Sequence, residues 1–223
     1  MKFSNVLFAL SVLVFVPACQ KSEIQNAPAA EVSETSATTA TDATSTAAQP
    51  GGPTTTANVI KEKSSINFIG AKVTRDHNGQ FKQFDGRIEY AGGQPQRVHF
   101  DIDLASLETD DPQLDAHLKT PDFFDVQKHP KATFTSTSLT AAPAGTPGGA
   151  THMLRGTLDM HGVQKEVSFP VIAQQSADGV RTQADFRINR HDWGISYKGM
   201  ADDLIKDDVR IRLDLMFPPP PAA

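Results

Sequence analysis

Seven histidines are the side chains best suited to acid–base or metal chemistry in this 223-residue sequence, and their spacing predicts neither. None belongs to an HExxH zinc motif, and the chain has no GxSxG nucleophile turn and no glycine-rich phosphate loop. His191 and Asp192 are adjacent, so in a strand they would point to opposite faces. The sequence therefore predicts no catalytic residue, no metal site and no cofactor. The histidines are His77, His99, His117, His129, His152, His161 and His191.

Apolar and polar residues alternate along most of the chain after Ala57. A period of two is typical of half-buried antiparallel strands with one apolar face and one wet face. We therefore predict an all-β domain of about eight antiparallel strands, arranged as a sandwich or an up-and-down barrel. A closed barrel of that size has room for side chains or for one small ligand. The alternating segments are Ile66–Phe68, Phe84–Tyr90, Val98–Leu104, Ala132–Leu139, Leu154–Met160, Val167–Val171, Ala184–Ile188 and Val209–Phe217.

One stretch, Ser106–Lys131, breaks this alternation. Asp111 followed by Pro112 is a helix-start signal, because an aspartate can cap the first turn and proline fits its first position. Thr120 and Pro121 repeat the signal before two phenylalanines. The sequence therefore predicts one or two short helices between strands, with apolar residues that could cover one end of a barrel.

Charge and composition exclude one class of partner. The formal net charge is -5, which argues against a nucleic-acid partner, since such proteins carry a basic face. Hydrophobic residues make up 39% and charged residues 21%, which are ordinary values for a globular protein. Oligomeric state cannot be inferred from these numbers.

The N-terminus has the layout of an export signal: Lys2, then the apolar run Val6–Val16, then a small residue before Cys19. The segment Val16–Cys19 resembles a bacterial lipobox, which implies that Cys19 is lipidated and becomes the mature N-terminus. The alternative is a plain signal peptide that happens to contain a cysteine. Gln20 follows the cysteine, so the sorting rule of enteric bacteria favours the outer membrane. We expect an exported, periplasmic protein that is lipid-anchored to a bacterial membrane.

These signals divide the chain into four parts. Residues 1–18 are the predicted signal peptide, and residues 19–57 are the lipidated cysteine with an Ala-, Thr-, Ser- and Pro-rich tether. The tether lacks apolar periodicity and is predicted to be disordered. Residues 58–217 form the predicted β-barrel, which leaves a Pro-rich disordered tail at 218–223.

The folded part resembles the YceI-like family. His117–Asp125 reads HLKTPDFFD and His129–Ser136 reads HPKATFTS, as in that family's signature. Further similarities lie at Ser65–Phe68, Gly156–Val163 and Asn189–Ile195. The resemblance implies a lipocalin-like antiparallel barrel whose lumen binds a polyisoprenoid or a similar long amphiphile. Many relatives carry a histidine soon after the first strand; Gly70–Thr74 has none, so no histidine role is transferred.

With this resemblance, inward-facing apolar side chains become the candidate ligand-binding residues. Each methylene group that leaves water contributes roughly 0.8 kcal/mol, so an apolar wall can bind a lipid without catalysis. The alternative is an envelope protein-interaction or stress-related module with a solid barrel core and no ligand. The candidate binding residues are Phe68, Phe84, Phe100, Ile102, Phe123, Phe134, Leu158, Phe169, Phe186 and Trp193.

Three residues have two interpretations each. Trp193 could line the barrel mouth or act as a structural wedge. Arg190 could meet a ligand phosphate or pair with a nearby aspartate. Phe123, together with its neighbour Phe124, could gate the lumen or pack a short helix onto the barrel end.

Overall fold

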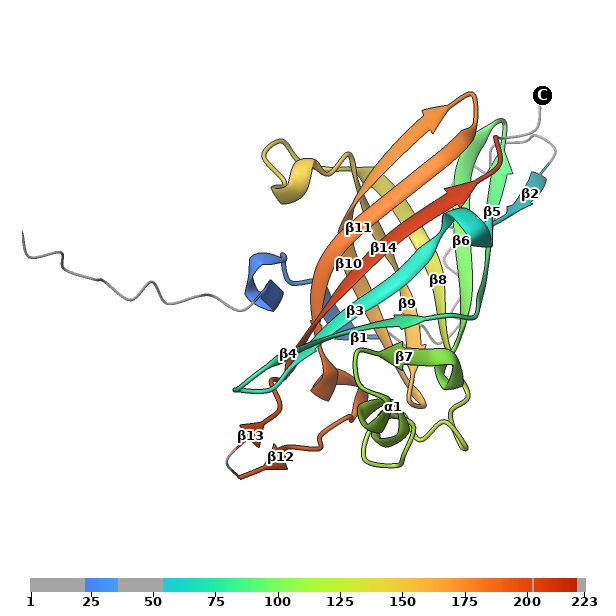
Figure 1. Ribbon diagram of the computed structural model, residues 1–223. Coiled ribbons are helices and arrows are strands. Elements are labelled where there is room, and N and C mark those ends of the chain that lie inside the picture. The colour runs from blue at the N-terminus through green and yellow to red at the C-terminus, as the bar shows by residue number, and fades with distance from the viewer. Residues whose placement is uncertain (1–22, 36–53, 202, 220–223) are drawn as a thin grey trace, which may run out of the picture.

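The computed structural model describes residues 23–35, 54–201 and 203–219, most of which belong to one strongly curled antiparallel sheet (Figure 1). The strand order is β2-β5-β6-β8-β9-β10-β11-β14-β3-β4-β7, and β1 pairs with β10. A separate two-stranded ladder joins β12 (Gly199–Met200) to β13 (Asp203–Leu204). The strands of the main sheet are β1 (Glu31–Glu34), β2 (Thr54–Asn58), β3 (Ser65–Ala71), β4 (Asp76–Phe81), β5 (Phe84–Ala91), β6 (Gln94–Asp103), β7 (Leu107–Thr109), β8 (Lys131–Ala141), β9 (His152–Met160), β10 (Val163–Ser176), β11 (Gly179–Asn189) and β14 (Asp208–Phe217).

All eight predicted strands are present, and they are neighbours in the sheet from β5 round to β3. The sheet has twelve strands because β1, β2, β4 and β7 add to them. These additional strands carry no alternating apolar run: β4 reads DHNGQF and β2 reads TTTAN. They form because a neighbouring strand offers backbone partners, and not because they have an apolar face of their own. The predicted all-β antiparallel barrel is confirmed, with more strands than expected.

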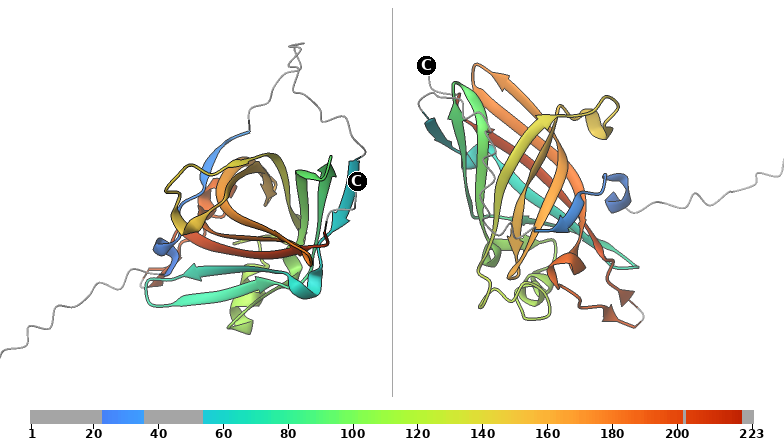
Figure 2. Two further views of the ribbon diagram at one scale, coloured as in Figure 1. Left: turned by 90° about the horizontal axis from the view of Figure 1, so that it is seen from above. Right: turned by 180° about the vertical axis from the view of Figure 1, so that it is seen from behind.

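The sheet curls around an interior but does not close completely (Figure 2). No continuous ladder joins the β3 side of the sheet to the β5 side. The residues just before β3 bridge this interval at one end. The Val59 amide donates to the Gly86 carbonyl on β5 (2.8 Å), and the Ile60 amide donates to the Met216 carbonyl on β14 (2.7 Å). At the other end, β7 pairs with β4 and so brings the chain after β6 back to the sheet. The result is a half-barrel whose remaining side is bridged by short segments.

One end of the half-barrel is covered by the segment that interrupts the strands. Helix α1 (Pro112–Leu118) begins as predicted, with the Asp111 carboxylate accepting from the Gln113 amide at 2.9 Å. The second predicted helix is absent: the chain after Thr120 forms consecutive turns. Asp125 in this stretch has a φ of 44°, a left-handed conformation that a right-handed helix cannot contain. No helix within the described ranges is long and apolar enough to cross a membrane.

The N-terminal segment corrects the predicted tether. Residues 23–35 lie on the barrel wall, where β1 pairs with β10 from Glu31–Ser168 to Glu34–Lys165. β11 pairs with β10 only as far as Ala184, and the segment occupies the place where these two strands separate, through a bridge of Ala29 to Arg187. β2 likewise pairs with β5. Backbone pairing thus orders residues whose composition predicts disorder; residues 19–22 and 36–53, with Cys19, lie outside the described part, as do residues 1–18.

Tyr90 on β5 carries a prediction of its own. Its side chain is 1% exposed, and its hydroxyl has no hydrogen-bond partner among the described residues. Burial also raises the pKa of the Tyr90 hydroxyl. An unpaired buried hydroxyl costs free energy, so we expect Tyr90→Phe to leave the free energy of unfolding unchanged or to raise it by about 1 kcal/mol. Urea unfolding of the two proteins tests this, and a clear loss of stability would show that the hydroxyl has a partner in solution.

Candidate functional site

The interior of the half-barrel contains an apolar cavity of about 130 Å³, which we call the upper chamber. Side chains from β3, β4, β6, β8, β9, β10, β11 and β14 line it, and nearly all of them are hydrophobic. Phe169 and Phe186 stack within its wall, with ring centroids 4.1 Å apart and planes at 12°. The wall offers dispersion contacts and no charge, so its chemistry suits a hydrocarbon.

A second cavity of about 130 Å³, the lower chamber, lies towards the end covered by α1. Its lining includes Leu114 and Leu118 from α1 and Phe123 and Phe124 from the turns that follow. The two chambers adjoin, because four residues line both of them: Phe81, Met160, Ile188 and Ile211. Phe81 packs against Phe124, with ring centroids 6.2 Å apart.

Three glycines keep large rings against the wall. Phe68 lies over Gly79 on the paired strand, Phe100 over Gly86, and Phe134 over Gly156. A Cβ atom placed on Gly79 or Gly86 would lie 2.2 Å from the facing ring, and one on Gly156 would lie 2.6 Å from the Phe134 ring. Each ring therefore fills the space that a side chain would occupy on the neighbouring strand, and the middle of the lumen stays open.

The structure brings together eight of the ten candidate binding residues. Six line the upper chamber: Phe100, Ile102, Phe134, Leu158, Phe169 and Phe186. Phe68 and Phe123 line the lower chamber. Phe84 and Trp193 line neither, although both are buried.

Trp193 is a structural wedge. It is 0% exposed, its indole nitrogen donates to the Leu158 carbonyl (3.2 Å), and its own carbonyl contacts Nδ1 of His161 (3.0 Å). It therefore fixes the 3-10 turn Arg190–Trp193 beneath the β9–β10 hairpin. Phe84 is buried in the same hydrophobic cluster as the chamber-lining residues but lines neither chamber.

The sequence analysis missed a set of lining residues for which a signal exists. Ile211, Leu213, Leu215 and Phe217 on β14 all line the upper chamber, and their alternation with charged residues is visible in the sequence. Met160 carries the same signal, because it ends the alternating segment Leu154–Met160, whereas Phe81 has none, since it ends β4, a strand without an alternating apolar run.

The Arg190 side chain holds neighbouring segments together at the lower end through hydrogen bonds to backbone carbonyls. It is 5% exposed, and its guanidinium donates to the carbonyls of Ile195 (2.7 Å) and Lys206 (3.1 Å). Asp207 lies 3.5 Å away. Burial lowers the pKa of Arg190, which the Asp207 carboxylate partly offsets. The ion-pair interpretation of Arg190 therefore holds, with the main contacts made to carbonyls.

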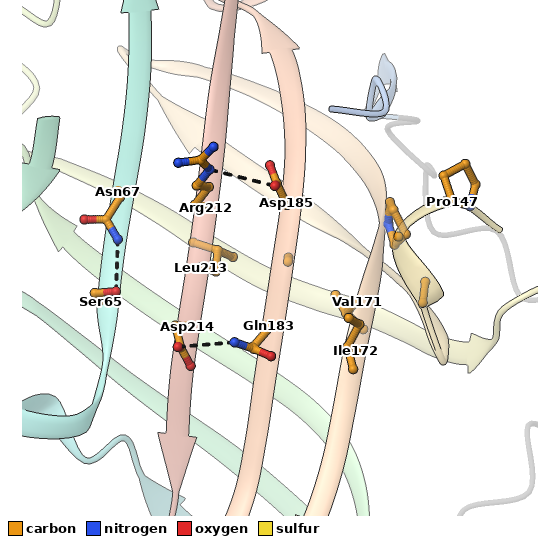
Figure 3. A pocket seen from close by; sticks show the side chains of 14 residues that line it. Ser65, Asn67, Pro147, Val171, Ile172, Gln183, Asp185, Arg212, Leu213 and Asp214 are labelled. Carbon is orange, nitrogen blue, oxygen red and sulfur yellow. Dashed lines mark hydrogen bonds and ion pairs between the residues drawn. The ribbon is translucent and has the colours of Figure 1, made fainter. Parts of the chain in front are cut away.

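A polar groove of about 490 Å³ lies on the outside of the sheet (Figure 3). Its side chains pair with one another: Asn67 donates to Ser65 (2.9 Å), Gln183 donates to Asp214 (3.3 Å), and Arg212 lies 3.8 Å from Asp185. Arg181 binds Asp214 through two hydrogen bonds and lowers the pKa of that carboxyl. Because these groups already satisfy one another, the apolar lumen is the better candidate site.

Four of the described histidines each lie beside one aspartate, and His129 and His161 lie against each other with ring centroids 4.9 Å apart. His77 is 8% exposed and lies 2.8 Å from Asp110, whose pKa is lowered by His77 and Arg75 against the opposing effect of desolvation. His99 contacts Asp101 (3.2 Å), and His117 contacts Asp122 (2.9 Å). Among the described residues no group of three or more histidines, cysteines and acids could hold a metal ion.

Comparison with known proteins agrees with this geometry. The model of the YceI-like domain matches residues 58–217. The chain belongs to the YceI-like domain family. UPF0312 proteins are similar to it: one from Pseudomonas putida is 32% identical over 142 residues, which is 60% of this chain and 71% of the relative. One from Pseudomonas syringae is 26% identical over 179 residues, 74% of this chain and 90% of the relative.

Two solved structures share the fold of this YceI-like domain. The crystal structure of Burkholderia cenocepacia BcnA has a TM-score of 0.61 and 23% identity, and covers 70% of this chain and 98% of its own. A polyisoprenoid binding domain from Saccharophagus degradans, implicated in plant cell wall breakdown, has a TM-score of 0.58 and 19% identity, with 74% and 98% covered. At these identities the likeness establishes the lipocalin-like barrel fold.

Proposed function

We propose that this protein is an exported, membrane-tethered binding protein that holds a polyisoprenoid or another long-chain amphiphile in its lumen and performs no reaction. The observation that carries the proposal is the pair of adjoining apolar chambers, kept open by rings that lie over glycines. Membership of the YceI-like family supports it, as does the fold neighbour whose name states polyisoprenoid binding.

The small volume of each chamber favours a narrow ligand over a compact one. Pockets that bury drug-sized molecules measure roughly 300 Å³ or more, and each chamber measures about 130 Å³. A compact ligand therefore does not fit either chamber. A narrow chain that enters both, past the four residues they share, makes apolar contact over the part of its length that lies inside the lumen. This geometry favours a linear lipid over a globular cofactor.

Export and anchoring complete the proposal. The signal-like N-terminus and the lipobox resemblance at Cys19 support a periplasmic protein attached to a bacterial membrane, with the outer membrane favoured by Gln20. A lipidated cysteine with more than one acyl chain would hold the protein firmly.

Native mass spectrometry of the full chain, purified after export in a bacterium, tests the proposal, with lipid extraction from the same sample. We expect one long-chain amphiphile per barrel. A protein that arrives empty and also rejects added solanesol, a nonaprenol, would refute the lipid-binding function and favour the solid-cored interaction module.

Phe81→Ala should lengthen the accepted chain. Phe81 lines both chambers, so its truncation widens the passage between them. We expect the bound lipids to shift towards longer chains, at a cost of about 3 kcal/mol in the free energy of unfolding. Mass spectrometry of extracted lipids measures the shift. Phe84→Ala is a matched control, since Phe84 is buried outside both chambers; an identical shift in that variant would contradict the threading geometry.

A further inference from the structure

Three large apolar side chains are strongly exposed in the described part of the chain, and all three lie on adjacent loops. Val73 is 65% exposed, Met200 is 71% exposed and Leu204 is 47% exposed. Val73 lies in the turn between β3 and β4, and the other two belong to the β12–β13 hairpin. The Val73 amide donates to the Leu204 carbonyl at 2.9 Å, which joins the two loops. We call Val73, Met200 and Leu204 the apolar tip.

The apolar tip adjoins the lower chamber. Lys72, Ile205 and Lys206 line that chamber, and each is a chain neighbour or near neighbour of a tip residue. The Lys206 amide donates to the Ala71 carbonyl (2.8 Å), and Lys72 and Ile205 form an isolated bridge. The residues of the apolar tip are therefore sequence neighbours of residues that line the lower chamber.

The described N-terminal segment begins beside the same loops. Ile24 is 0% exposed and packs against Ile69 and Ala71 at the end of β3, next to Lys72. Arg210 donates to the Glu23 carbonyl at 2.8 Å and holds the segment in place. Cys19 is four residues before Glu23, so about 14 Å of extended chain is the most that can separate them. In Figure 1 this segment, in blue, lies on the same side of the barrel as the β3–β4 turn.

The charges of these loops nearly balance. Lysines and arginines are matched by aspartates, so long-range attraction to an anionic surface is not the driving force. Apolar side chains raised on a loop tip, with lysine stems around them, are suited to the interface of a lipid bilayer. The charged residues of the two loops are Lys72, Arg75, Asp76, Lys198, Asp202, Asp203, Lys206 and Asp207.

We propose that the apolar tip inserts into the surface of the membrane to which the protein is tethered, and that lipid passes between bilayer and lumen at the lower chamber. This inference rests on the proposed lipid-binding function and adds the docking surface and the entry end. It also sets the orientation of the protein: the short link from Cys19 to Ile24 keeps the lower end at the membrane.

Tryptophan quenching tests the insertion independently of ligand binding. Met200→Trp in the full chain is mixed with phosphatidylcholine vesicles that carry brominated acyl chains. We expect the emission of the new tryptophan to shift to the blue and to be quenched. The native Trp193 is 0% exposed and supplies a constant background. Gln94→Trp is the control, because Gln94 is exposed and begins β6. The β5–β6 hairpin lies at the opposite end of the barrel from the β12–β13 hairpin (Figure 1).

The two outcomes are distinct. Quenching at position 200 with none at position 94 supports docking through the apolar tip. Equal quenching at both positions, or none at position 200, overturns it, and the exposed tip would then be a surface for a protein partner.

A transfer assay tests the entry end. The triple variant Val73→Ser, Met200→Ser, Leu204→Ser should take up radiolabelled solanesol from vesicles about tenfold more slowly than the natural chain, because its apolar contacts with the bilayer are lost. Uptake of the same lipid added from ethanol should not change. Equal rates from vesicles would overturn the inference. If neither protein binds the lipid from either source, the proposed function fails, and the quenching result still decides the docking surface.

Discussion

Replacing Gly86 with alanine is expected to abolish most ligand binding, because the new methyl group would push the Phe100 ring into the upper chamber. The added Cβ would lie 2.2 Å from the ring, far inside van der Waals contact. The Phe100 ring is buried between strands and faces Phe217 at 6.2 Å, so its free direction is into the cavity. Overpacking of this kind costs about 1–3 kcal/mol of stability.

Separate measurements distinguish the loss of ligand affinity from the loss of stability. We expect affinity for solanesol to fall about tenfold or more, since a displaced phenyl ring takes a large share of a 130 Å³ chamber. Thermal unfolding should still show a cooperative transition. Phe84→Ala is the control for lost stability alone, since Phe84 is buried and lines neither chamber. A second variant, Gly86→Ala with Phe100→Leu, should regain binding because the clash is removed.

Unchanged binding in Gly86→Ala would mean that the ring moves outward or that the ligand lies elsewhere. A loss in Phe84→Ala equal to that in Gly86→Ala would likewise count against the lumen as the site. Either result would direct attention to the outer polar groove.

The alternating pattern predicted the eight central strands because each has its own apolar face. It also predicted part of the lumen wall, since inward residues on one strand share a parity: Phe100 and Ile102 on β6 follow this rule. The ring-over-glycine pairs could not be predicted. They depend on which residues face each other across two strands, such as Phe68 and Gly79, and register is set by the assembled sheet.

The N-terminal segment shows a different limit of sequence patterns. Its composition predicts disorder, and Ile24 and Val32 are the only large apolar side chains between residues 23 and 35. Ile24 and Ala27 are nonetheless buried, because the outer face of β3 and the separation of β10 from β11 provide a place for them. A composition argument measures what a segment can bury by itself and cannot account for a site that the rest of the fold supplies.

Arg190→Ala should produce the largest loss of stability at the lower end of the barrel. Arg190 donates to the carbonyls of Ile195 and Lys206, which would lose these partners while still shielded from water. Removal of one partner from a buried, charge-assisted network costs about 3–5 kcal/mol. Arg190→Lys should recover little of it, because one ammonium cannot reach both carbonyls in the geometry of the planar guanidinium.

Arg190→Ala should also loosen the lower chamber, because Ile195, Ile205 and Lys206 belong to its wall. Loosening of this segment should raise hydrogen exchange of the Ile205 and Lys206 amides, which donate to the Lys198 and Ala71 carbonyls. Exchange at the β10–β11 end of the barrel should change only as far as global stability falls. His191→Ala is the matched control: His191 follows Arg190, is exposed, and contacts the same Asp207 at 3.1 Å. If both variants destabilise the protein equally, then the ion pair with Asp207, and not the carbonyl contacts, holds the segments around Arg190 together.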